Sequence, residues 1–427
     1  MRSLEEIRGW KDLFFGALSG GVATLEEMHT SIARLPFSLL ERAPVTGTPA
    51  AVVRFVHDGI TGGVYFALRG LAEGARTAAE AALVPLASAA PDDAPPARPA
   101  LELAVSALNG FVGDRLEESR NGLRFRMGFR HAGRPLALEA EALRRAFPEA
   151  ANARGRLAVF VHGLAGNDGV WRFYAEANWG DPETTYGSLL ARDLGYVPLY
   201  LRYNSGLHVS ENGRLLAETM EELVRVWPGG VEEIVLVAHS MGGLVTRSAC
   251  HQGKTSGQAW VDAVRHVFCL GTPHLGAPLE KLGNVAGYVL GSFELTRPLA
   301  RIVNGRSVGI KDLRYGYLVE EDWRDRDLDA LLEDNRHDIP FLDSATHYFI
   351  AATITRSHDH PLGVLLGDTL VRLPSASGRG APLARRVPFR DEHGLHLGAM
   401  SHLELLNHPA VYAQIRCWLE AAGMPGG

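Results

Sequence analysis

Residues 234–244, with the sequence IVLVAHSMGGL, constrain the fold more than any other part of the chain. The apolar run 234–237 is typical of a strand that is buried on both faces. Ser240 follows between two small residues, Ala238 and Gly242, before a segment that suits a helix. A serine at the apex of a sharp strand-to-helix turn has an unfavourable backbone conformation, so the residues two positions away must be small. The pattern predicts that Ser240 is a nucleophile rather than a purely structural serine.

Other apolar runs alternate with helical stretches along the second half of the chain. The runs are residues 157–161, 197–200, 234–237, 267–270 and 348–354, and a typical helical stretch is 215–226. Alternating strands and helices predict an α/β fold with a mostly parallel, doubly wound sheet and right-handed crossovers. Residues 275–343 interrupt this alternation and are expected to form a helical insertion between two core strands.

The first hundred residues have a different character. Apolar residues recur at three to four positions before Pro36 and again over 52–82, which predicts a helical N-terminal region over residues 1–100. It ends in a Pro-rich linker, 88–100, and the second domain is expected to span 101–427. After a further helical stripe, 101–112, residues 123–129 alternate in polarity, which predicts an antiparallel strand that returns at 136–138.

Composition and charge exclude several function classes. Hydrophobic residues make up 46% and charged residues 22% of the 427 residues, which is typical of globular proteins. The 43 basic and 49 acidic residues give a net charge of −6, so no nucleic-acid partner is expected. Residues 1–10 do not resemble a signal peptide, and no apolar stretch is long enough for a spanning helix. Three widely spaced cysteines, Cys250, Cys269 and Cys417, favour a reducing compartment. A cytoplasmic location is therefore expected, with a peripheral lipid interface as the alternative.

A second motif follows the first core strand, where Val161 is followed by His162-Gly163-Leu164-Ala165-Gly166. An oxyanion hole needs one backbone N–H beyond this strand and one directly after the nucleophile. These amides would belong to Leu164 and Met241. Gly163 would let the backbone approach a substrate closely, and His162 is expected to orient or pack rather than to act as a base.

The acid and the base are expected after the nucleophile in the chain. Asp368 follows Gly367 in a loop beyond the strand 348–354, and we favour it over Asp343 and Asp359. His402 lies just before the final helix, 409–422, and we favour it over its rivals, which are His393, His396 and His408. His402 would take the proton of Ser240, and Asp368 would fix the imidazole tautomer.

Further substrate contacts are expected from His162, Gly163, His239 and Asn204. The segment 203–208 that contains Asn204 follows a core strand and could line the substrate pocket. A simple turn with a helix cap at Ser210 or Asn212 explains the same residues at least as well. No metal and no cofactor are expected, because His358-Asp359-His360 is a poor ligand pattern by itself and no phosphate-binding glycine loop occurs.

These segments together resemble the lipase and esterase branch of the α/β-hydrolase superfamily, especially bacterial hydrolases similar to GPI inositol-deacylases and triacylglycerol lipases. The matching pieces lie between about 156 and 419: Val161-His162-Gly163, Ala238-His239-Ser240-Met241-Gly242-Gly243, Leu270-Gly271-Thr272-Pro273-His274-Leu275-Gly276, Gly367-Asp368 and Ser401-His402-Leu403. Ala238 departs mildly from the first glycine of the usual motif.

The resemblance implies an α/β-hydrolase fold with a cap, formed by the insertion at about 275–343, over the site. It implies a serine carboxyl-ester hydrolase that acts on an ester or lipid substrate through an acyl-enzyme. One alternative is an acyltransferase with the same Ser-His-Asp triad. Another is a non-catalytic scaffold that binds a lipid or polyester surface. For the N-terminal helices, intramolecular packing is favoured over docking to a neutral lipid or granule surface, because the basic residues in 52–82 are few.

Overall fold

The computed structural model describes residues 22, 26, 61–62, 64–65, 68–75, 77, 99–118, 120, 123–148, 155–277, 306–328, 334–357, 359–380 and 386–423. The chain divides into two units, Met1–Ala107 and Leu108–Gly427. This boundary falls inside helix α3 (Pro99–Glu118), a few residues after the boundary expected near residue 100. The described residues between 61 and 77 are helical, and the rest of the predicted stripe 52–82 lies outside the described residues.

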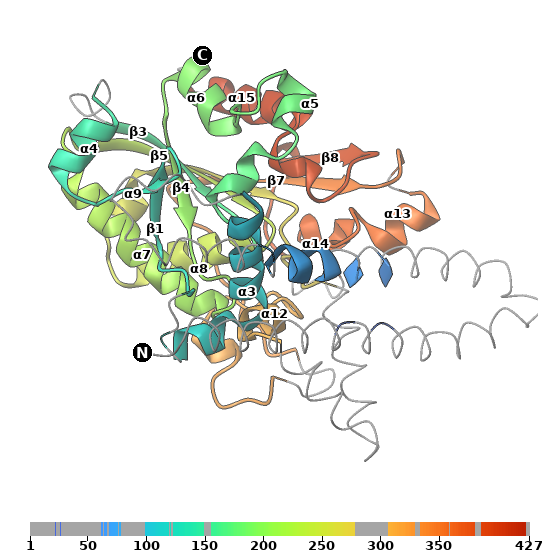
Figure 1. Ribbon diagram of the computed structural model, residues 1–427. Helices are drawn as coiled ribbons and strands as arrows, with labels where there is room; N and C mark the ends of the chain where they lie inside the picture. The colour runs from blue at the N-terminus through green and yellow to red at the C-terminus, as the bar shows by residue number, and fades with distance from the viewer. Residues whose placement is uncertain are drawn as a thin grey trace, which may run out of the picture. The chain divides into compact units, whose positions relative to one another are not determined.

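An eight-stranded sheet forms the centre of the second unit, with the order β2-β1-β4-β3-β5-β6-β7-β8 (Figure 1). Strands β3 to β8 are parallel to one another, and β1 is antiparallel to both β2 and β4. The strands are β1 (Gly128–His131), β2 (Arg134–Pro135), β3 (Gly155–Val161), β4 (Val197–Arg202), β5 (Val231–His239), β6 (Val264–Leu270), β7 (Thr346–Thr353) and β8 (Gly394–Gly398). The predicted α/β class with a mostly parallel, doubly wound sheet is confirmed.

Helices cover both faces of this sheet. They are α4 (Ala140–Ala146), α5 (Ala175–Trp179), α6 (Tyr186–Leu194), α7 (Val209–Val226), α8 (Met241–Thr255), α9 (Trp260–Ala263), α12 (Val308–Asp312), α13 (Pro361–Leu366), α14 (Leu373–Ala376) and α15 (Pro409–Gly423). Short 3₁₀ turns add η2 (Asp168–Arg172), η3 (Glu320–Asp322), η5 (Asp391–His393) and η6 (Glu404–Leu406). Figure 1 shows α7 and α8 on one face, and α6 and α15 on the other.

The core strands β3, β5 and β6 each contain a continuous apolar run, because both faces of that part of the strand pack against helices. In β3, Leu157 and Val159 belong to the hydrophobic cluster that includes α7 and α8 residues, whereas Ala158 and Phe160 belong to the cluster with α6 and α15. Successive side chains of a strand point to opposite faces. A continuous apolar run is therefore what a sheet covered on both sides requires.

The structure differs from the sequence expectation at the two edges of the sheet. The antiparallel strand expected over 123–129 begins only at Gly128, and its return strand is β2 at Arg134–Pro135 rather than 136–138. The Asn109 side chain of α3 explains the late start. Its amide nitrogen donates to the Leu123 carbonyl at 2.8 Å, and its oxygen accepts from the Phe125 amide at 2.7 Å. At the other edge, β8 was not expected.

The insertion lies between β6 and β7 in the chain, as expected, although residues 278–305 and 329–333 of it lie outside the described residues. Its α12 packs on the loop after β4. Asp312 is fully buried and contacts His208 Nδ1 at 3.0 Å, and it accepts a bond from the Val209 amide at 2.7 Å. Trp323 stacks on the His208 ring at 3.7 Å. Burial opposes a charge on His208, but the Asp312 carboxylate outweighs it and raises the His208 pKa.

This pair makes stability depend on pH. Because the pKa of His208 is raised in the folded state, the stabilisation from its charge is complete below the unfolded-state pKa of about 6.5. It is lost as the pH rises through the folded-state pKa. We therefore expect His208→Gln to lower the unfolding temperature more at pH 6 than at pH 9. Thermal unfolding of both proteins at the two pH values measures this. An equal decrease in unfolding temperature at the two pH values would contradict an ion pair between His208 and Asp312.

None of the helices in the described ranges has the length and apolar composition of a bilayer-spanning segment.

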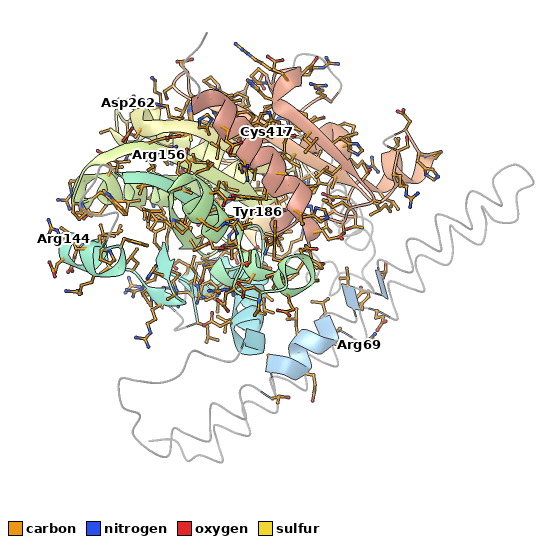
Figure 2. The ribbon with its side chains drawn as sticks, turned by 90° about the horizontal axis from the view of Figure 1, so that it is seen from above. Arg69, Arg144, Arg156, Tyr186, Asp262 and Cys417 are labelled. Carbon is orange, nitrogen blue, oxygen red and sulfur yellow. The ribbon has the colours of Figure 1, made fainter. Side chains whose placement is uncertain are left out.

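Tyr186 ties α6 to α15 and shows how the helices on that face are held. Its hydroxyl accepts a bond from the His408 amide at 2.7 Å and lies 3.1 Å from the Leu405 carbonyl, to which it donates. Its ring stacks on Tyr412 at 6.3 Å. Figure 2 shows Tyr186 beside the helix that carries Cys417.

We expect Tyr186→Phe to destabilise the protein by about 1–3 kcal/mol, because it leaves a buried amide and carbonyl without their partner. Urea unfolding followed by circular dichroism measures the change. Tyr174→Phe is the control, because Tyr174 is 42% exposed. Equal effects of the two substitutions would contradict this role of the Tyr186 hydroxyl.

Candidate active site

Ser240 connects the end of β5 to the start of α8. It has φ 54° and ψ −128°, a backbone conformation that costs a non-glycine residue about 1–3 kcal/mol. Its amide donates to the Leu270 carbonyl at the end of β6, at 2.8 Å. The parallel ladders on both sides of β5 hold this strand, so the strained turn projects Ser240 from the carboxyl edge of the sheet.

Small residues around Ser240 allow the close packing that this turn needs. A Cβ atom at Gly242 would collide with the carbonyl oxygens of Val161 and His162 at the end of β3. A Cβ atom at Gly163 would lie 2.8 Å from the Ser240 Cβ. Ala238 is fully buried in β5, opposite Val161. The close approach of these backbones explains why both motifs are rich in glycine and alanine.

The turn after β3 is held by hydrogen bonds on both sides of Leu164. The Gly166 amide donates to the Gly163 carbonyl at 3.2 Å, and the Ala165 amide donates to Ser205 Oγ at 2.9 Å. Ala165 has φ 56°. Met241 is the first residue of α8, a position whose N–H has no acceptor within its own helix. The oxyanion-hole role of Leu164 and Met241 stays a prediction.

His402 and Asp368 form a buried pair. His402 Nδ1 lies 2.7 Å from Asp368 Oδ2, and the His402 amide donates to the Asp368 carbonyl at 2.9 Å. The other carboxylate oxygen, Oδ1, accepts from the amides of Leu370 and Val371 at 3.0 and 2.8 Å. Asp368 is 0% and His402 2% exposed, so the imidazole is fixed in orientation.

The second ring nitrogen of His402 is available. His402 Nε2 is buried and has no hydrogen-bond partner among the described residues. The ring lies against the backbone that contacts Ser240, because a Cβ atom at Gly271 would lie 3.1 Å from both Cε1 and Nδ1 of His402. Gly271 directly follows Leu270, which accepts the bond from the Ser240 amide. The structure therefore brings Ser240, Asp368 and His402 to one place.

His239, which the sequence predicts to contact substrate, contacts His402 in this structure. His239 Nε2 donates to the His402 carbonyl at 3.0 Å, and the two rings lie 4.6 Å apart. Burial, and then the nearby His402, lower the pKa of His239 well below its usual value. A neutral His239 with its hydrogen on Nε2 positions the His402 backbone. The predicted substrate contact stays a prediction.

His162 and Asn204 are also tied to the backbone. His162 Nδ1 donates to the Gly163 carbonyl at 2.8 Å, and burial lowers its pKa to about 4, so it is neutral. Asn204 donates through its amide to the Gly113 carbonyl of α3 at 2.9 Å and accepts from the Gly206 amide at 3.1 Å. These bonds hold both side chains on the backbone, and the substrate contacts predicted for both residues stay predictions.

The rival residues lie elsewhere. Asp343 precedes β7 and Asp359 is exposed in the loop after it. His396 lies in β8 and bonds Thr353 at 2.9 Å, His408 accepts from the Ala410 amide at 3.2 Å, and His393 lies in η5. His358 lies outside the described residues.

Sequence reasoning missed Ser205, which accepts the bond from Ala165. Ser205 is buried and follows β4, whose carboxyl end adjoins that of β3. The position of this polar residue just beyond a core strand is the sequence signal that could have identified it.

We expect Gly243→Ala to destabilise the protein by about 1–3 kcal/mol, because the new Cβ would collide with the Thr272 side chain. Helix propensity alone predicts that the substitution stabilises the protein by up to ~1 kcal/mol. The sign of the change in stability therefore shows whether the collision or the propensity dominates. Chemical unfolding measures it. Gly70→Ala is the control, because Gly70 is helical and has nothing within 4 Å of an added Cβ. A stabilising Gly243→Ala would contradict the close packing.

One family model and several solved structures are similar to parts of this chain. Residues 152–328 match the family model described as a PGAP1-like alpha/beta domain. Among solved structures, Bacillus licheniformis lipase BlEst2 in mature form is 21% identical, with 62% of this chain and 92% of that chain covered and a TM-score of 0.39. A thermophilic esterase from Thermogutta terrifontis is 13% identical, with 64% and 92% covered and a TM-score of 0.35.

The metagenomic carboxyl esterase MGS0156 is 16% identical, with 68% of this chain and 80% of that chain covered and a TM-score of 0.36. At these identities and TM-scores, no conclusion about this chain is drawn from the three likenesses. No curated protein matched the chain.

Proposed function

We propose that the chain is a serine hydrolase of carboxylic esters, a proposal that the match of residues 152–328 to the PGAP1-like alpha/beta domain and the eight-stranded, mostly parallel sheet support. The observation that carries the proposal is the buried Asp368–His402 pair beside the strained turn of Ser240. A buried imidazole nitrogen without a hydrogen-bond partner is costly. His402 Nε2 has no partner within the described part of the chain, which supports its proposed role as the acceptor of the Ser240 proton.

In the proposed mechanism, Ser240 Oγ attacks the acyl carbon and its proton passes to His402 Nε2. Asp368 Oδ2 accepts the bond from His402 Nδ1–H and stabilises the imidazolium that forms. The amides of Leu164 and Met241 donate to the developing oxyanion, and each such donor contributes ~3 kcal/mol. The protonated His402 then gives its proton to the leaving alcohol. Water attacks the acyl-enzyme in the second half of the cycle.

The substrate class that suits this site is an ester or lipid. An acyltransferase would use the same first half-reaction and differ only in the acceptor, since an alcohol would replace water. A p-nitrophenyl ester series of increasing acyl length, with and without a soluble alcohol, measures both preferences. Hydrolysis as the main product in the presence of alcohol is expected. Dominant transesterification would move the proposal to acyl transfer.

We expect Ser240→Ala to lower ester turnover by several orders of magnitude while the protein stays folded, because Ser240 supplies the nucleophile. A fluorophosphonate probe should label the wild type and leave Ser240→Ala unlabelled. Circular dichroism checks that the variant is folded. Appreciable turnover by the folded variant would overturn the assignment of the nucleophile.

The carboxylates provide a matched pair of variants. Asp368→Asn should lower kcat by roughly 10⁴, by analogy with the wrong-tautomer effect in serine proteases. Asp359→Asn should change kcat little, because Asp359 lies in an exposed loop. The reverse result would assign the acid to Asp359 and leave Asp368 as the residue that holds its own turn.

A further inference from the structure

Residues 163–166 form a tight turn beside Ser240. The Gly166 amide donates to the Gly163 carbonyl at 3.2 Å, so Leu164 and Ala165 are the two central residues of the turn. A Cβ atom at Gly163 would lie 2.8 Å from the Ser240 Cβ, which shows that the turn packs against the proposed nucleophile. The conformation of the turn therefore sets the direction of the Leu164 amide, the proposed oxyanion donor.

The first peptide plane of the turn joins Gly163 to Leu164, and two donors fix it. The Gly163 carbonyl accepts from the Gly166 amide and also from His162 Nδ1, at 2.8 Å. A trans peptide is planar, and its N–H points away from its C=O. Because the Gly163 carbonyl is directed into the turn, the Leu164 amide faces outward from it.

The second peptide plane joins Leu164 to Ala165, and Ser205 fixes it. The Ala165 amide donates to Ser205 Oγ at 2.9 Å. Ala165 has φ 56°, in the left-handed region that is unfavourable for a residue with a side chain. Such a conformation persists only where the surrounding structure holds it. The bond to Ser205 is one of the contacts that hold it here.

The loop that carries Ser205 is itself held by two helices. Ser205 is 1% exposed, and a Cβ atom at Gly309 of α12 would collide with its carbonyl oxygen. The neighbouring Asn204 donates to the Gly113 carbonyl of α3 at 2.9 Å. Figure 1 shows α3 and α12 beside one another. The Ser205 hydroxyl is therefore a fixed point from which the turn after β3 is held.

We propose that Ser205 is a positioning residue for ester hydrolysis, which holds the turn 163–166 so that the Leu164 amide faces the developing oxyanion. The inference rests on the proposed function, because it requires that Ser240 attacks an ester. Ser205 acts through Ala165 and takes no part in the proton transfers. Since the oxyanion forms only on the way to the transition state, a displaced donor lowers kcat and leaves substrate binding almost unchanged.

The experiment compares Ser205→Ala with the wild-type full chain on a soluble p-nitrophenyl ester. We expect kcat to fall roughly 10- to 100-fold, less than the ~10²–10³-fold cost of losing a whole donor, and KM to stay within about twofold. The midpoint of the pH profile of kcat should not move, because the Asp368–His402 pair is unchanged.

A trifluoromethyl ketone provides a readout that a merely structural role would not change. The Ser240 oxygen adds to its carbonyl carbon, the Ser240 proton passes to His402, and the former carbonyl oxygen becomes an oxyanion. The ketone should bind Ser205→Ala more weakly, by the same factor by which kcat/KM falls. Ser205→Cys keeps nearly the same shape with a weaker acceptor, so its kcat should lie between those of the wild type and Ser205→Ala.

Ser248→Ala is the matched control. Ser248 is also fully buried, and its hydroxyl donates to the Leu318 carbonyl on the far side of α8 from the turn. Its loss removes a buried hydrogen bond of the same kind. Urea unfolding should therefore show a similar loss of stability for the two alanine variants, whereas Ser248→Ala should keep the kcat and the ketone affinity of the wild type.

The outcomes separate this inference from the proposed function. Wild-type kcat and ketone affinity in folded Ser205→Ala, beside an inactive Ser240→Ala, would overturn the positioning role and leave the hydrolase standing. Equal losses of kcat in Ser205→Ala and Ser248→Ala would also overturn it, because lower stability alone would then explain both. Turnover by folded Ser240→Ala would overturn the proposed function and the positioning role with it.

Discussion

The parallel pairing of β3 with β5 is the constraint on which the candidate site depends. The two strands run in register from Leu157 opposite Ile234 to Val161 opposite Ala238. Since both strands end at the same edge, the turn that follows β3 and the serine that follows β5 must meet there. Strand β4 lies on the far side of β3, so the chain order reverses at this point, where open α/β sheets form their ligand sites. The glycines at 163 and 242 let the two backbones approach within contact distance.

How much of the fold could be predicted depends on how strongly each strand is buried. The strands β3, β5 and β6 are covered on both faces, and their unbroken apolar runs made them visible in the sequence. The edge strand β8 has the sequence GLHLG and is only half-buried, so neither an apolar run nor a strong alternation marks it. Residues 123–129 do alternate, but Asn109 supplies hydrogen bonds to Leu123 and Phe125 that a neighbouring strand would otherwise provide. A local sequence pattern cannot predict these contacts, because Asn109 lies 14 and 16 positions before its two partners.

In the candidate site, too, features formed by adjacent residues could be predicted, and contacts between distant segments could not. Ser240 and Gly163 could be recognised because strand, small residues and helix are adjacent in the sequence. The pairing of Asp368 with His402 is a contact between two loops, and sequence reasoning could choose it over rivals only by position relative to β7 and α15. The supporting bonds of His239 and Asn204 to backbone carbonyls could not be predicted, because any polar side chain beside a site can face either the ligand or the scaffold.

The loop after β4 has a consequence for how the protein reaches its active form. Asn204 and Ser205 bond α3 and the turn after β3, and Gly206 accepts a bond from Gly309 of the insertion at 3.1 Å. The contacts with α3 and with the insertion each join residues about a hundred positions apart in the sequence. Contacts of such long sequence separation close large loops, which slows their formation. The turn that would hold the oxyanion is therefore complete only after the end of α3 and the insertion have both docked. During refolding, recovered activity should lag behind recovered secondary structure.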